Sequence, residues 1–88
     1  MTSNEAIAQL EAAVAQAHKA AHTIDNLLAA HDYQDVAALS VRAAKSLLEA
    51  AISFMRNDDV TAFAGIESSG DLVDALYDIV DGELDDED

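Results

Sequence analysis

The chain has 88 residues, of which 51% are hydrophobic, and it carries a formal net charge of −14 at pH 7. A chain of this length forms one domain with little surface to bury, which leaves self-association open. Only four residues are Lys or Arg and none is Cys, which argues against direct nucleic-acid binding and excludes disulfides and thiolate metal sites. The sequence lacks the pattern of a signal peptide and any apolar run of about 20 residues, so we expect a cytoplasmic protein without a membrane segment.

The first predicted helix covers residues 4–30. Thr2 or Ser3 is the expected N-cap, with Glu5 in the spacing of a capping box. Apolar residues recur along this segment at alternating steps of three and four, which is a heptad seam. The helix 1 seam consists of Ile7, Leu10, Val14, Ala17, Ala21, Ile24 and Leu28. It predicts a long amphipathic helix that packs on a neighbouring helix.

The second predicted helix covers residues 33–56, after a polar interruption in which Asp32 and Asp35 are candidate caps. Two adjacent apolar stripes run along it, one through Leu47 and the other through Leu48. So wide an apolar surface requires two neighbouring helices. The second helix is therefore predicted to be the central element.

The last third of the chain contains the only glycines, Gly65, Gly70 and Gly82, and proline is absent throughout. This composition predicts an all-α fold, a small three-helix bundle, with a short helical turn over 59–64 that Gly65 ends. A third helix is predicted over 69–81, where Gly82 ends it. Its expected core residues are Leu72, Val73, Leu76, Tyr77, Ile79 and Val80. Residues 1–82 then form the domain, and 83–88 form a disordered acidic tail.

The acidic residues are concentrated near the C-terminus. Residues 67–88 contain ten acids and no base, whereas residues 1–66 contain eight acids and four bases. Steps of three and four place Asp71, Asp74, Asp78 and Asp81 on one side of the third helix, where neighbouring carboxylates repel each other. Either this row serves solubility or a high-salt habitat, or a basic surface of a partner protein neutralises it.

A metal site and an enzyme active site are the weaker interpretations. His18 and His22 lie four residues apart, with Asp25 three further on, so they are weak candidates for metal ligands on one helix face. The fourth ligand and the stronger zinc motifs are missing. Nucleophile elbows and glycine-rich phosphate loops are missing as well, so we expect neither catalysis nor a cofactor.

The leading hypothesis is a non-catalytic protein that binds a basic, nucleic-acid-binding surface of another protein. The predicted contact residues are Asp71, Asp74, Asp78 and Asp81, supported by Glu67, Glu83 and Asp85, with Tyr77 as an anchor if it is exposed. A small, acidic, helical profile of this kind is similar to that of phage-encoded inhibitors of host defence complexes that imitate nucleic acid, and to that of some antitoxins. The alternative hypothesis is a homodimer or larger oligomer that pairs through the helix 1 seam, with the acids serving only for solubility.

Overall fold

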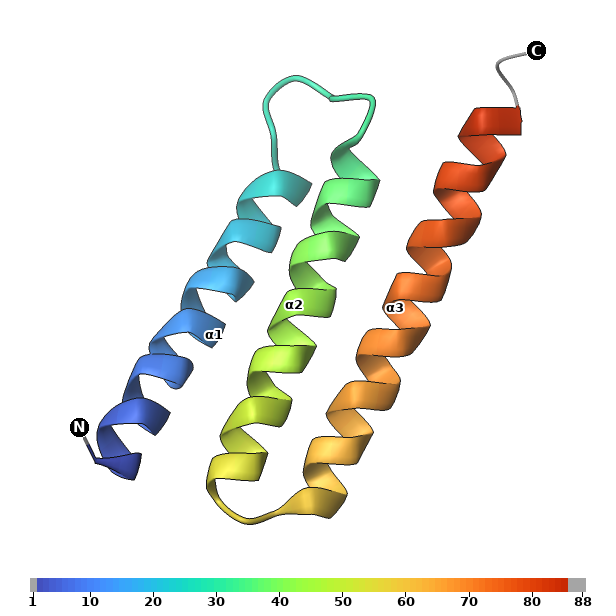
Figure 1. Ribbon diagram of the computed structural model, residues 1–88. Coiled ribbons are helices and arrows are strands. Elements are labelled where there is room, and N and C mark those ends of the chain that lie inside the picture. Colours follow the sequence, from blue (N-terminus) through green and yellow to red (C-terminus); the bar gives the residue numbers. More distant parts are fainter. Residues whose placement is uncertain (1, 86–88) are drawn as a thin grey trace.

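The computed structural model describes residues 2–85 and contains three α-helices, α1 (Ser3–Asp25), α2 (Gln34–Met55) and α3 (Asp59–Asp85). They lie side by side and antiparallel, with α2 in the middle (Figure 1). The predicted all-α, three-helix fold is confirmed, and so is the central position of the second helix, since α2 contacts both neighbours. Within residues 2–85, no contact joins α1 to α3.

The three helices form a single flat layer. The molecule measures 52 × 28 × 17 Å, and its radius of gyration is 15.4 Å. A compact domain of this length has a radius of gyration of about 12 Å. The larger value follows from the arrangement, because helices that meet only at a central neighbour cannot enclose a common core.

Small side chains make up most of the buried surface in this layer. The buried residues are Ala21, Ala38, Ala43, Ala50, Ile52, Ala62 and Ser69. Such side chains allow neighbouring helices to approach closely, but each of them removes little apolar area from water. Many of the large apolar side chains are therefore left exposed at the surface of the layer.

The first helix is shorter than predicted, because α1 ends at Asp25 and not near residue 30. The side-chain amide of Gln34 donates hydrogen bonds to the carbonyls of Ile24, at 2.8 Å, and Asp25, at 3.3 Å. Asn26 donates through its side chain to the carbonyl of His22, at 2.8 Å. These bonds satisfy the last carbonyls of α1, so the helix ends here.

The segment between α1 and α2 differs from the prediction in two further details. Leu28 was predicted to lie in the helix 1 seam, but it lies beyond the helix and is fully exposed. Tyr33, not Asp32, occupies the N-cap position of α2, and its side chain makes no capping bond. The backbone N–H of Tyr33 instead donates to Nδ1 of His31, at 3.0 Å.

The predicted break before residue 69 is wrong, because α3 is one continuous helix through Gly65, Gly70 and Gly82. None of the described glycines has a positive φ angle, so they do not act as helix stops. Gly65 instead allows α3 to approach α2. A Cβ atom at this position would lie 3.2 Å from Ala50 Cβ and 3.2 Å from the carbonyl oxygen of Ser46.

The C-terminal end of α3 also differs from the prediction. The helix continues past Gly82 to Asp85, so its backbone includes part of the predicted tail. Residues 86–88, the rest of that tail, lie outside the described residues.

The turn between α2 and α3 is fixed by Asn57 and Asp58. Asn57 has a φ angle of 59°, a left-handed conformation that ends α2. Asp58 Oδ1 then accepts a hydrogen bond from the backbone N–H of Thr61, at 3.1 Å. The bonds from the Thr61 hydroxyl and N–H lower the pKa of the Asp58 carboxyl below its ordinary value of 3.8. Asp58 is therefore the N-cap of α3.

Replacement of Gly65 by Ala is expected to destabilise the fold by about 1 kcal/mol, although Ala is the better helix former. The added methyl group meets the α2 backbone, and overpacking costs more than the gain in helix propensity. Gly70→Ala is the matched control, because a Cβ atom there meets nothing within 4 Å. It is expected to stabilise the fold by about 0.5 to 1 kcal/mol. Urea unfolding in dilute solution measures both changes, and equal effects would contradict the proposed role of Gly65.

Asp58→Ala is expected to lower the thermal midpoint at neutral pH, because the N-cap is lost. Since the folded-state pKa of Asp58 is lowered, the charge contribution of the cap is fully present above the ordinary pKa. It is lost as the pH falls through the folded-state pKa. Asp58→Asn keeps an acceptor oxygen, so the difference in midpoint between wild type and this variant should shrink between about pH 7 and about pH 3. Calorimetry measures it, and a constant difference would contradict the assignment.

Candidate partner-binding surfaces

The predicted acidic row lies along the outer edge of the layer. We use the name acidic ridge for the side chains of Glu67, Asp71, Asp74, Asp78 and Asp81, all of which are exposed. The buried or half-buried residues of α3, such as Ala62, Leu72 and Leu76, lie on the opposite side of the helix, toward α2. From end to end the ridge rises about 21 Å along the helix.

The basic side chains do not neutralise the ridge. Three ion pairs occur among the described residues: Arg42 with Asp25, Arg56 with Glu11, and Lys45 with Glu49. All of them lie within α2 or between α1 and α2. Positive charge is therefore compensated on one side of the molecule, while the ridge occupies the other.

The predicted supporting residues do not all share this edge. Tyr77 is 68% exposed, but it lies on the adjacent side of α3 with Val73 and Val80. Glu83 and Asp85 lie on the last turn of α3, and their side chains are outside the described residues. Position therefore assigns only the four aspartates and Glu67 to one common surface.

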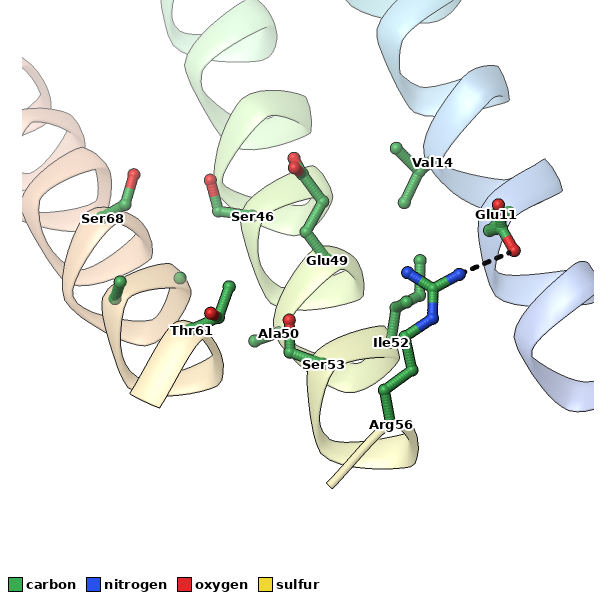
Figure 2. A pocket seen from close by; sticks show the side chains of 12 residues that line it. Glu11, Val14, Ser46, Glu49, Ala50, Ile52, Ser53, Arg56, Thr61 and Ser68 are labelled. Carbon is green, nitrogen blue, oxygen red and sulfur yellow. Dashed lines mark hydrogen bonds and ion pairs between the residues drawn. The ribbon is translucent and has the colours of Figure 1, made fainter. Parts of the chain in front are cut away.

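An open groove crosses one face of the layer above α2 (Figure 2). It has a volume of about 610 Å³, opens to solvent and is lined by all three helices. Its polar groups include Ser46, Glu49, Ser68 and the Arg56 guanidinium, which is paired with Glu11 at 3.3 Å. Ligand pockets cover most of their ligand, whereas this groove is open and is lined by polar and apolar groups in similar amounts.

The candidate metal ligands lie farther along the same face, in a second hollow of about 340 Å³. His18, His22 and Asp25 line it together with Arg42, and the Asp25 carboxylate forms an ion pair with that arginine. His22 lies next to the side chain of Asn26. Within the described part of the chain, no three metal-binding side chains are grouped to hold an ion.

The helix 1 seam is directed toward α2 of the same chain. Ala21 is buried, and the other seam residues within α1 are half-buried: Ile7, Leu10, Val14, Ala17 and Ile24. Because α2 is the neighbour of α1, this apolar stripe already has an intramolecular partner. The alternative hypothesis of pairing through the seam would require that contact to open.

The opposite face of the layer is apolar and exposed, contrary to the core position predicted for part of it. We name this apolar face by its large side chains: Leu47, Phe54 and Met55 of α2, with Phe63, Ile66, Val73, Tyr77 and Val80 of α3, each at least 40% exposed. The predicted core positions of Val73, Tyr77 and Val80 are therefore wrong. Heptad spacing was the signal for this face, since the stripe 63, 66, 70, 73, 77 and 80 is visible in the sequence.

Comparisons with known proteins give no relative: no family model matches the chain, and no similar curated protein or solved structure is found. Among the described helices, none is long and apolar enough to cross a membrane. Function is therefore inferred from the acidic ridge and the apolar face. The ridge and the apolar face are open surfaces of the kind that proteins bind.

Replacing the four aspartates of the ridge by asparagine is expected to stabilise the protein by about 1 kcal/mol at low salt. Each like-charged pair at a spacing of three or four residues costs about 0.2 to 0.5 kcal/mol, and the negative helix end adds to this cost. The gain should shrink in molar salt, which screens repulsion.

A matched control neutralises four acids in or near the first turns of the helices, where negative charge is favourable. It changes Glu5, Asp32, Asp35 and Asp59 to the corresponding amides and has the same net charge as the ridge variant. Its stability should fall. Thermal unfolding measures both variants, and a loss of stability in the ridge variant would contradict the repulsion.

Proposed function

We propose that this chain is a non-catalytic protein-binding module whose acidic ridge docks on a basic, nucleic-acid-binding surface of another protein. The observation that supports this proposal is the position of the ridge, exposed on the outer edge of α3, while the described ion pairs lie on α1 and α2. A row of carboxylates that destabilises its own helix is explained if a partner neutralises it.

The charge density of the ridge supports an imitation of phosphate. One strand of B-DNA carries one negative charge per 3.4 Å of axis, so about 21 Å of strand carries about six phosphates. The ridge presents five carboxylates over the same length. A protein surface that binds a nucleic-acid strand therefore meets a similar number of charges in a similar row.

Occlusion is the proposed mechanism. The module covers the basic surface of its target and keeps nucleic acid away, as expected of the inhibitor and antitoxin types that share its charge profile. Long-range attraction between the ridge and a basic surface accelerates the encounter and decreases with salt. Packing against α2 stabilises the helix that carries the ridge, because most helical stability in proteins comes from tertiary packing of an amphipathic face.

The test is affinity capture from cell lysate with three immobilised proteins: the wild-type chain, the four-asparagine ridge variant and the charge-matched control described above. A true partner is basic, is retained by wild type and the control, and is released by duplex DNA. Its affinity for the ridge variant should fall at least about tenfold, which corresponds to about 1.4 kcal/mol. Association rates at several salt concentrations measure how strongly electrostatic attraction accelerates the encounter.

Two results would contradict the proposed function. In the first, the ridge variant and the charge-matched control lose the partner equally, which would show that only total charge matters. In the second, affinity is unchanged between low and molar salt, which is incompatible with recognition through carboxylates at a solvated edge.

A further inference from the structure

The apolar face is the largest feature of the layer that the proposed function does not use. Its side chains are half or more exposed at Leu47, 50%, Phe63, 58%, and Tyr77, 68%. The acids and bases of α2 lie on other sides of the helix, and α3 carries no charged residue in this stripe from Phe63 to Val80. Among the described residues, this uncharged surface can approach a second copy without direct charge repulsion.

The size of the face matches what a dimer requires. One fully exposed large side chain has an accessible area of about 200 Å². Multiplied by the exposed fractions of the eight side chains, this gives a total exposed area of about 800 Å² for the apolar face. A standard stable interface buries about 800 Å² on each partner. Exposed apolar patches larger than a few hundred Å² are rare on proteins that remain monomeric.

The two stripes of the face differ in the size of their side chains. Phe54 of α2 and Phe63 of α3 are in edge-to-face contact, with ring centroids 6.5 Å apart. From this point both helices carry the residues of the face at steps of three and four. Small residues predominate on α2, where the stripe continues through Ala51, Leu47, Ala44, Ser40 and Ala37. Large residues predominate on α3, where it continues through Ile66, Gly70, Val73, Tyr77 and Val80.

We propose that a second copy of this chain covers the apolar face, forming a two-fold symmetric sandwich of two three-helix layers. The two-fold axis runs parallel to the helices, between α2 and α3, so that α2 of one copy lies on α3 of the other. The mainly small stripe of α2 in one copy then faces the mainly large stripe of α3 in the other. The same patch is used on both subunits, as in an isologous dimer.

This orientation also separates the charges. Rotation about an axis parallel to the helices places the two acidic ridges on opposite edges of the sandwich. They are then separated by about two helix diameters, or about 20 Å, which exceeds the Debye length of about 8 Å at physiological salt. An axis perpendicular to the helices would bring the two ridges together on one edge.

The experiment measures the mass of the full chain by sedimentation velocity across a wide range of concentrations, at low and at molar salt. The wild-type chain should show twice the 9.3 kDa of one chain, with a tighter dimer in molar salt because repulsion between acidic subunits is screened. Gly70→Glu places an unpaired charge in the interface and should weaken dimerisation at least 100-fold. Gly82→Glu adds the same charge away from the face, where a Cβ atom also meets nothing within 4 Å, and should dimerise like wild type.

Leu47→Glu provides a second test on α2, and circular dichroism establishes that each variant is folded. A wild-type chain that stays monomeric at the highest concentration in molar salt, as it would if a different protein covered the face, overturns the proposal. Equal dimerisation by Gly70→Glu and Gly82→Glu overturns it too, as does a stable mass other than a dimer. These outcomes are distinct from failure of the ridge hypothesis, because salt strengthens the dimer and weakens binding through the ridge.

Discussion

The structure depends on close contact between helices through very small residues. Gly65 and Ala50 bring α3 against α2, and a methyl group at Gly65 would meet the α2 backbone at 3.2 Å. Buried side chains in the layer are mainly alanines, so each helix pair has a narrow interface. Few large side chains are fully buried in such interfaces, and the absence of contact between α1 and α3 in residues 2–85 leaves no central core to receive them. The exposed apolar face is the direct result of this packing.

Hydrophobic spacing predicted the helical class, the central position of α2 and the residues that share each stripe. The limits of two helices were wrong, because they depend on bonds between distant residues: Gln34 caps α1 from ten residues away, and Gly65 serves packing against α2. For the sites, spacing placed the four aspartates on one exposed side correctly. It did not predict that Tyr77 is exposed, because periodicity shows which residues share a side and not which side a neighbour covers.

Charge and apolar area are separated on this small molecule. The outer edge of α3 carries carboxylates, the groove face carries ion pairs between α1 and α2, and the opposite face carries exposed apolar side chains. This separation allows two independent interactions, one that salt weakens and one that salt strengthens. A dimer of the proposed form presents two acidic ridges on opposite edges. On a target with two basic surfaces, binding of the first ridge would raise the effective concentration of the second, which increases the overall affinity.

The open layer also determines how the chain unfolds. With α2 as the shared neighbour of α1 and α3, each outer helix is held by one interface, as a terminal unit is held in a linear array of repeats. Loss of α1 removes nothing from the contact between α2 and α3, and loss of α3 leaves the contact between α1 and α2 intact. In such a chain the two outer helices open with separate free energies, which native-state hydrogen exchange measures. Within the described residues, a change at the ridge on α3 can reach α1 only through α2.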